Sequence, residues 1–269
     1  MNARSKKLAR IGTILAVVLG LFVLSIPLLA GVIGPLLPHA VQDPVGRKTI
    51  EAAREDAGYC NGEAGLAALD RLADRLIAKS GLDAPVHVYV VDGELLNAFA
   101  APGGHIVIFR PIIEEAHDPD ELAGVLAHEM AHEIESHPAK GLVQMLGYGI
   151  FGLLTPGGDN IGREVATHIL QSTYSRDDEL EADHRGVQLL NDAGLDSRGL
   201  ARFFDTMKDK GGDIPGALEF LSTHPTGEHR QAALKDLARE GEHAMSDADW
   251  AAIKGICAST TTNATSVGS

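Results

Sequence analysis

Aromatic residues are scarce in this 269-residue chain, at 4%, although 45% of its residues are hydrophobic. A core of this composition consists mainly of Ala, Leu, Val and Ile. A basic patch is also lacking beyond the first ten residues, which carry +4, so the remainder carries −18 and the whole chain −14. Such an acidic surface repels nucleic acid and anionic lipid headgroups. We therefore expect no nucleic-acid partner.

Charge is absent from residues 11–37, a run of 27 positions that is long enough to cross a bilayer as a helix. The basic cluster before this run predicts that the N-terminus stays in the cytoplasm. The rest of the chain is then outside, on the periplasmic side of a bacterial inner membrane. A signal peptide cleaved near Ala30, followed by secretion, is the alternative. The length of the run favours an uncleaved anchor.

Cysteine occurs only twice, as Cys60 and Cys257, and this spacing excludes a CxxC redox or zinc motif. In an exported protein the two can form one disulfide that joins the start of the folded domain to its end. Two unpaired thiols are the alternative, and the inferred compartment favours the disulfide.

The sequence divides into three parts. Residues 1–42 form a basic stub with the anchor or signal peptide, residues 43–258 a folded domain, and residues 259–269 a polar tail that is predicted to be disordered. At the start of the domain, residues 47–80 are predicted to be helical. Residues 83–110 are predicted to form strands separated by glycine-containing turns, which indicates a hairpin or small antiparallel sheet.

Two later helices have clear start signals. Asp118 caps a helix that is expected to run to about His137, because Pro138 follows. Ser175 begins a second helix, with an acidic residue three positions later, and Gly194 ends it. The uncharged run 141–154 between them is a buried helix or a surface that touches lipid, and we favour burial. Further helices are predicted at 161–172, 197–210, 215–222, 227–240 and 247–256.

The segment HEMAH carries the chemistry. His128 and His132 are four residues apart, so on a helix they share one face and can both bind one zinc ion. Glu129 is rotated by about 100° around the helix, so it cannot easily share the metal. It can instead accept a proton from a water molecule there. A polar surface helix is the alternative interpretation.

A third ligand comes from the second capped helix. Glu179 and Asp183 are four residues apart and share a face, so Glu179 can bind the metal while Asp183 fixes the tautomer of a ligating imidazole. A solvated acidic helix start is the alternative for this segment. Glu181 and His184 are expected to face solvent.

Five blocks in the same order resemble the gluzincin metallopeptidases of the HtpX, BepA and CAAX-prenyl-protease family. The blocks are LNAFAAPGGHIVIF, HEMAH with a histidine five residues later, YSRDDELEAD, NDAGLDSRGLARFF and STHPTGEHR. The resemblance spans about residues 95–232. It implies a mainly helical α+β fold, a zincin-type peptidase domain with a small antiparallel sheet beside the metal helix, preceded here by one membrane helix.

The resemblance also implies roles for the residues that match. His128, His132 and Glu179 are then ligands of one Zn²⁺ per chain, with Glu129 as general base and Asp183 behind the ligands. His137 matches a recurrent family histidine that we do not assign as a ligand. From its position in the loop THPTGEHR, we expect His224 to approach the metal or the developing oxyanion, with Arg230 pairing with Asp183 or another acid.

These residues predict a zinc metalloendopeptidase that cleaves unfolded or misassembled envelope proteins. The substrate is expected to add as a strand to the edge of the 105–109 strand. One alternative is a membrane-anchored chaperone or assembly factor whose zinc site is latent or secondary. Another is a purely structural metal, which has no use for the general base.

Overall fold

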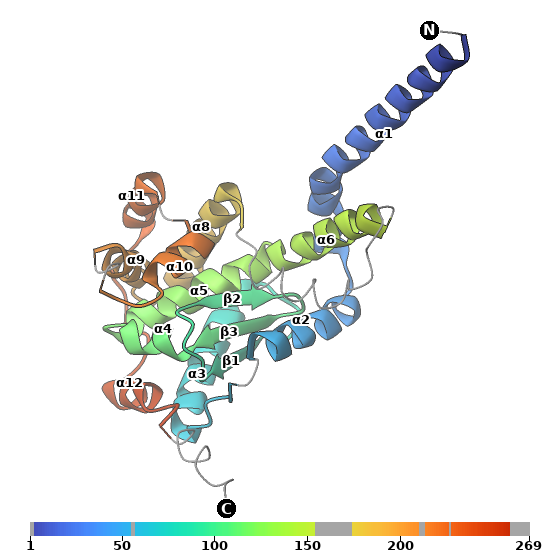
Figure 1. The fold of residues 1–269 in the computed structure, drawn as a ribbon. Helices are drawn as coiled ribbons and strands as arrows, with labels where there is room; N and C mark the ends of the chain where they lie inside the picture. Colours follow the sequence, from blue (N-terminus) through green and yellow to red (C-terminus); the bar gives the residue numbers. More distant parts are fainter. Residues whose placement is uncertain (1–2, 55–56, 154–173, 210–212, 226, 259–269) are drawn as a thin grey trace, which may run out of the picture.

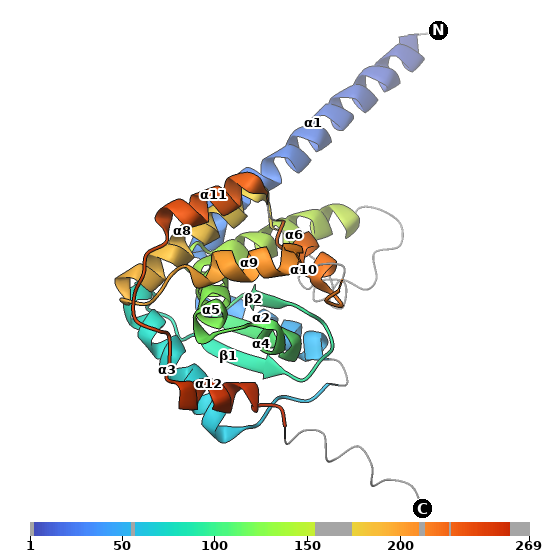
Figure 2. The ribbon, with the colours of Figure 1, turned by 90° about the vertical axis from the view of Figure 1, so that its left-hand side faces the viewer.

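The computed structural model describes residues 3–54, 57–153, 174–209, 213–225 and 227–258. A first long helix, α1 (Ala3–Ile33), projects away from the rest of the molecule (Figures 1 and 2). A short 3-10 turn, η1 (Gly34–Leu36), follows it. Residues Arg10–Leu36 are long and apolar enough to cross a membrane. The predicted tail, residues 259–269, lies outside the described residues, as does the helix predicted at 161–172.

Two helices replace the single one predicted over residues 47–80. Helix α2 (His39–Arg54) begins before the predicted start at residue 47, and α3 (Glu63–Ser80) follows a break. At the break the chain is extended, because Cys60 N–H donates to Val90 O and Tyr59 forms a bridge with Val91. These hydrogen bonds to a neighbouring strand override the helical pattern of the segment.

The sheet has three strands in the order β1-β3-β2, formed by His87–Val91, His105–Phe109 and Ala98–Ala101 respectively. Strands β2 and β3 form the predicted antiparallel hairpin, but β1 pairs with β3 in parallel. The sheet is therefore mixed, and the prediction of an antiparallel sheet is wrong for β1. Every residue of β3 is buried, which suits the central position with a partner on each side.

Helix α4 (Arg110–Glu115) leads to the central helix, α5 (Pro119–Ile134). The side chain of Asp118 caps α5 as predicted, because it accepts hydrogen bonds from the N–H groups of Asp120 and Glu121. The helix ends earlier than predicted, at a turn in which Ser136 has a left-handed φ of 59°. Helix α6 (His137–Leu153) then begins, with Pro138 in its first turn, where a proline is tolerated.

Helix α8 (Arg176–Asp192) begins with the predicted capping box, in which Ser175 and Asp178 bond to each other's backbone N–H groups. It is followed by α9 (Gly199–Asp209), α10 (Ala217–Thr223), α11 (Glu228–Leu237) and α12 (Asp247–Lys254). In Figure 2, α8, α9 and α11 lie on one side of the sheet, while α3 and α12 lie on the other. A disulfide joins Cys60, just before α3, to Cys257, just after α12.

Helix α5 is the centre of the core, with its residues from Asp120 to His132 buried. It packs against α8, α9 and β2. Two glycines allow α9 to approach closely, since a Cβ on Gly199 would lie 1.8 Å from Asp120 O and one on Gly124 would lie 2.4 Å from Leu200 N. This packing surrounds the polar residues of α5 with protein on all sides.

Candidate metal centre

The Nε2 atoms of the two histidines of α5 face each other. His128 and His132 lie one turn apart on the same face and are almost fully buried. Their Nε2 atoms are 3.1 Å apart. Two imidazole lone pairs can converge at such a distance only if a proton or a metal ion lies between them.

Helix α8 brings Glu179 to the same point. Its Oε1 lies 3.5 Å from His132 Nε2, and its Oε2 lies 3.6 Å from His128 Nε2. The carboxyl group is fully buried, and neither of its oxygens has a well-aligned hydrogen bond within the described part of the chain. A buried carboxylate in this situation is costly unless a cation binds it.

A fourth donor comes from the end of α10. His224 is buried, and its Nδ1 lies 3.3 Å from Glu179 Oε1. One donor atom from each of His128, His132, Glu179 and His224 lies within 4.8 Å of all the others. Ligands bound tetrahedrally to one zinc ion at about 2.0–2.1 Å are about 3.3–3.4 Å apart. The measured separations of 3.1 to 3.6 Å therefore fit a metal ion of this size.

The other nitrogen of each ligating histidine also has a neighbour. His128 Nδ1 lies 3.1 Å from Asp183 Oδ1, although the contact is poorly aligned for a hydrogen bond. His132 Nδ1 lies 2.9 Å from Nδ1 of His137, whose Nε2 lies 3.1 Å from Glu181 Oε2. One set of tautomers satisfies this chain: His132 donates to His137, and His137 donates to Glu181. Both Nε2 atoms then keep the lone pairs that a metal requires.

Arg230 holds the acidic residues of α8 together. Its Nε and Nη2 donate to the two oxygens of Asp183, at 2.6 and 2.7 Å, and its Nη1 lies 2.6 Å from Glu179 Oε2. Nη1 also donates to Pro225 O, the residue after His224. The arginine therefore ties the loop that carries His224 to α8 and offsets the negative charge of two buried carboxylates.

Glu129 lies beside the donors but is not one of them. Its carboxyl group is buried, accepts a hydrogen bond from the backbone N–H of Ala100, and has Oε1 3.7 Å from His224 Nε2. Burial raises the pKa of Glu129 above its ordinary value, although the nearby histidines oppose this. A carboxyl group so placed can accept a proton from a neighbouring water molecule and release it again.

The pKa values of His132, His128 and Glu179 are also shifted by burial and by neighbouring charges. Burial lowers the pKa of His132 well below its ordinary value, which favours the neutral imidazole. Burial also lowers the pKa of His128, but the carboxylates of Asp183 and Glu179 beside it outweigh this and raise it to about 10. For Glu179, burial is outweighed by His224 and the other two histidines, and its pKa is held well below the usual range.

The edge strand beside the site is β2. The 105–109 strand, β3, is paired on both sides, so the prediction that a substrate adds to its edge is wrong. Two carbonyls of β2 point into the site: Ala98 O lies 3.3 Å from His224 Nε2, and Ala100 O accepts from the hydroxyl of Tyr174 at 3.3 Å. The Tyr174 ring also stacks on His132 at 3.9 Å. Both groups occupy positions that an added strand would need.

Two contributions to the site were missed at the level of sequence. His137 was not assigned a partner, and Glu181, which is exposed as expected, also accepts a hydrogen bond from His137 behind His132. Their residue types give no signal, because a histidine at a helix end and an acid in a first turn are both common on surfaces.

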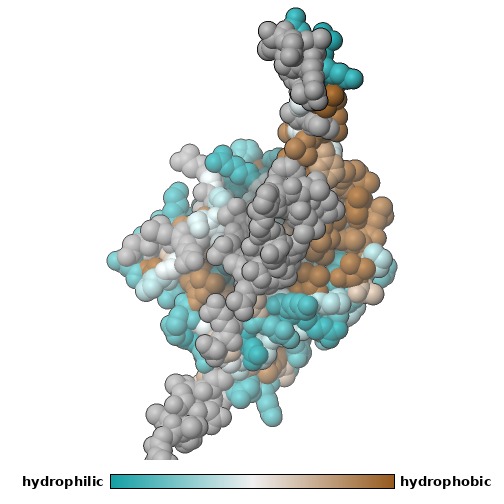
Figure 3. Space-filling view, turned by 45° about the vertical axis from the view of Figure 1, so that its right-hand side comes forward, coloured by the Kyte–Doolittle hydropathy of each residue, from teal (hydrophilic) through white to brown (hydrophobic). Residues whose placement is uncertain are grey.

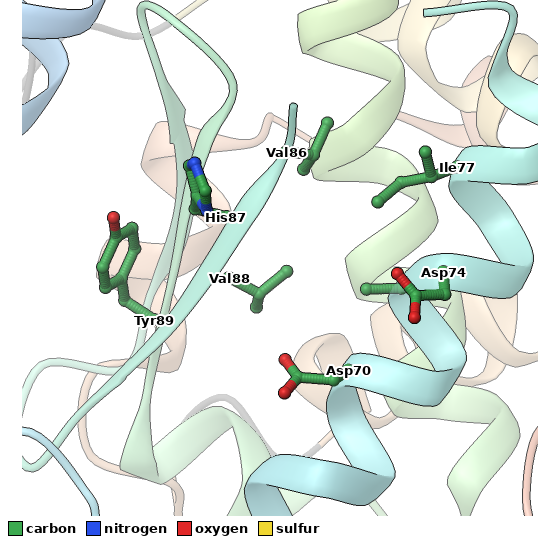
Figure 4. Close-up of a pocket in the computed structure, with 8 residues that line it drawn as sticks. Asp70, Asp74, Ile77, Val86, His87, Val88 and Tyr89 are labelled. Atoms are coloured by element: carbon green, nitrogen blue, oxygen red, sulfur yellow. The ribbon is translucent and has the colours of Figure 1, made fainter. Parts of the chain in front are cut away.

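A separate cavity of about 360 Å³ lies between α3 and β1, lined by Asp70, Asp74 and His87 among others (Figure 4), and contains none of the residues above.

Comparison with known proteins gives consistent relatives. The sequence profile of peptidase family M48 matches residues 64–238. The mitochondrial metalloendopeptidase OMA1 of Arabidopsis thaliana is 33% identical over 152 residues, which are 55% of this chain and 30% of that protein. The beta-barrel assembly-enhancing protease of Yersinia pestis is 28% identical over 187 residues, 64% of this chain and 38% of that protein. OMA1 of Schizosaccharomyces pombe is 28% identical over 179 residues, which are 65% of this chain and 53% of that protein. The matched part is thus less than two thirds of each of these relatives.

Proposed function

The chain belongs to peptidase family M48, and we propose that it is a zinc-dependent metalloendopeptidase with one Zn²⁺ per chain. The observation that carries this proposal is the convergence of His128, His132 and Glu179 within zinc-binding separation, with the Glu129 carboxyl beside them. Because a structural site needs no general base, a buried carboxyl of raised pKa at this point favours hydrolysis.

The mechanism assigns one task to each group. His128, His132 and Glu179 would hold the zinc ion, which would supply a Lewis acid that polarises the scissile carbonyl and makes a water molecule more acidic. Glu129 accepts the proton of that water and passes it to the leaving nitrogen, so no acyl-enzyme forms. Asp183 and His137 hold the imidazoles of His128 and His132 in the tautomers that leave Nε2 free. Arg230 keeps Glu179 and Asp183 in position.

The substrate is an extended polypeptide that adds to the free edge of β2. Main-chain hydrogen bonds to Ala98 and Ala100 tolerate many side chains, which suits unfolded or misassembled proteins as substrates. For this to happen, His224 and Tyr174 must release the two carbonyls. We therefore infer a closed arrangement, in which His224 also occupies the fourth position around the proposed metal site, as its proximity to the other three donors supports.

The setting is the outer side of a membrane. We propose that residues 1–42 anchor the chain, that residues 43–258 form the peptidase domain on the non-cytoplasmic side, and that envelope proteins are the clients. The uncharged run of α1 and the disulfide, which requires an oxidising compartment, support this setting. Relatives named beta-barrel assembly-enhancing proteases support a role in envelope protein quality control.

A second function is favoured by the same closed site. A chaperone or assembly factor with a latent metal centre would bind client proteins while His224 blocks the fourth position. In that case removal of the general base would leave its biological role unchanged, whereas a peptidase would lose its role.

The test compares the unaltered protein, Glu129→Gln and His224→Ala. Each is full-length, in detergent, with unfolded casein as substrate. We expect cleavage by the zinc-loaded protein, loss of cleavage on chelation, and a fall of about 100- to 10,000-fold in Glu129→Gln. Zinc content, measured on each preparation, should be unchanged in Glu129→Gln because that carboxyl does not bind the metal. His224→Ala should cleave faster than the unaltered protein if closure limits the rate.

Two results would contradict the proposal. Equal cleavage by Glu129→Gln would show that Glu129 is not the base. Absence of cleavage in all forms, including His224→Ala with full zinc content, would favour the binding function instead.

A further inference from the structure

Helix α6 leaves the metal centre and runs along the candidate membrane helix. It begins at His137, which contacts His132, and its side next to α1 is closely packed (Figure 1). A Cβ on Gly34 would lie 2.8 Å from Lys140 N, and one on Gly147 would lie 3.0 Å from the side chain of Ile26. Since residue 34 meets residue 140 and residue 26 meets residue 147, the two helices are antiparallel over about two turns.

Small residues lie at the closest points of the seam between the two helices. Ile26 and Ala30 of α1 are buried, and Gly34 of η1 continues the same face at intervals of four residues. Gly34 approaches Lys140, and Gly147 of α6 approaches Ile26. Close packing through small residues is typical of helix pairs within a bilayer, where association depends on van der Waals contact.

The outward faces of the two helices form one apolar surface. On α1 and the following η1, the side chains of Leu24, Leu28, Val32 and Leu36 are 66–75% exposed. On α6, Leu146 and Tyr148 are 49% and 43% exposed, so the predicted burial of this segment is wrong for them. Figure 3 shows the resulting hydrophobic surface, which extends from the base of α1 onto the adjoining part of the domain.

A charged residue, Lys140, marks the end of this apolar surface that is nearest to the domain. After Lys140, α6 contains no charged residue through its last position. Lys140 itself lies beside Gly34, close to the domain end of the uncharged run of α1. Ile26, which packs on Gly147, is eight residues beyond Gly34, or about 12 Å further into that run. The middle of α6 is therefore at the level of the apolar part of α1, and Lys140 is at the level of its polar boundary.

We propose that α6 inserts into the hydrocarbon layer beside α1, in the leaflet nearest to the domain, with Lys140 at the headgroups. The exposed leucines of both helices then contact lipid. The N-terminal end of α6, outside the membrane, holds His137 against His132. Three residues separate His137 from Lys140, about 5 Å along the helix, so the metal centre lies near the membrane surface. If the proposed function holds, its substrates are polypeptides that emerge at that surface.

The test uses a fluorescent probe on single cysteines. Because the only two cysteines are joined in the disulfide, a new one is the single free thiol. The variants are Leu146→Cys on α6, Leu24→Cys on the exposed face of α1, and Ala78→Cys, which is exposed on α3 away from α1. Each full-length protein is labelled with an environment-sensitive dye and reconstituted into phosphatidylcholine vesicles.

We expect the probes at positions 146 and 24 to emit at shorter wavelength, to be quenched by nitroxide-labelled lipids and to be shielded from iodide. The probe at position 78 should show the reverse. Leu146 is half exposed, so its replacement should leave thermal unfolding unchanged, which is measured as a control.

Three outcomes would overturn the proposal. A water-like probe at 146 with a lipid-like probe at 24 would leave the anchor intact and place α6 outside the membrane. A probe at 146 that is shielded from iodide but not quenched by the lipids would indicate a protein partner, such as a second copy. Water-like probes at all three positions would remove the anchor as well. None of these results depends on peptidase activity, so they are distinguishable from failure of the proposed function.

Discussion

At the scale of single residues, the metal centre depends on groups that do not touch the metal position. His132 and His128 are alike in sequence, but each has a different group behind it. Asp183 is an acid that Arg230 already engages, whereas His137 is a neutral acceptor held by Glu181. The orientation of His132 therefore depends on a hydrogen bond between two imidazoles, which is made only in one tautomer of each.

We predict that His137→Ala weakens metal binding by about 10- to 100-fold, because His132 loses the group that fixes its tautomer. The measurement is competition for zinc against a chelator of known affinity. His184→Ala is the matched control, since His184 is exposed on α8 and should leave affinity unchanged. Equal affinities in the two variants would show that His137 has no influence on the metal.

At the scale of secondary structure elements, the site depends on how closely α9 and α8 approach α5. Local patterns determine where these helices begin, through the caps at Asp118 and Ser175. The distance between them depends on glycines that have no room for a side chain. Gly199 meets the backbone of Asp120, and Gly124 meets the backbone of Leu200. Backbone atoms cannot move aside in the way that a flexible side chain can.

We therefore predict that Gly199→Ala lowers the free energy of unfolding by about 1–3 kcal/mol or more, because the new methyl group overlaps Asp120 O. Denaturant unfolding of the purified protein measures it. The control is Gly141→Ala in α6, where a Cβ meets nothing within 4 Å. Alanine there should be neutral or stabilise the helix by about 0.5–1 kcal/mol. Similar stabilities for the two variants would contradict close packing of α9 on α5.

At the scale of the whole molecule, the two ends of the domain are joined. Cys60 and Cys257 are 197 residues apart in sequence, and their disulfide holds α12 beside the start of α3. The backbone adds to this, because Gly62 N–H donates to Ile256 O. The disulfide thus closes nearly the whole domain into one loop, on the side of the molecule away from α1 (Figure 1).

We predict that replacing both cysteines by serine lowers the stability of the domain substantially, with an upper limit of roughly 5 kcal/mol from the loop entropy of the unfolded chain. Thermal unfolding with and without a reductant measures the effect. Reductant should lower the melting temperature of the unaltered protein and leave that of the double variant unchanged. An unaltered melting temperature in the double variant would contradict the prediction.

The sequence by itself determined features that depend on neighbours along the chain. The spacing of His128, Glu129 and His132 follows from the helical repeat, and the caps at Asp118 and Ser175 follow from hydrogen bonds within one turn. The family was recognisable from the order of five short blocks, and the profile of peptidase family M48 agrees. The antiparallel hairpin of β2 and β3 was predictable for the same local reason.

Tertiary structure alone decided where segments far apart in sequence meet. The parallel pairing of β1, the edge position of β2 in the sheet and the placement of α6 on α1 all contradict or go beyond the local patterns. So do the contacts of His137 with His132 and of His224 with Glu179. Such contacts arise from burial of apolar surface over the whole domain, which has no period or spacing in the sequence.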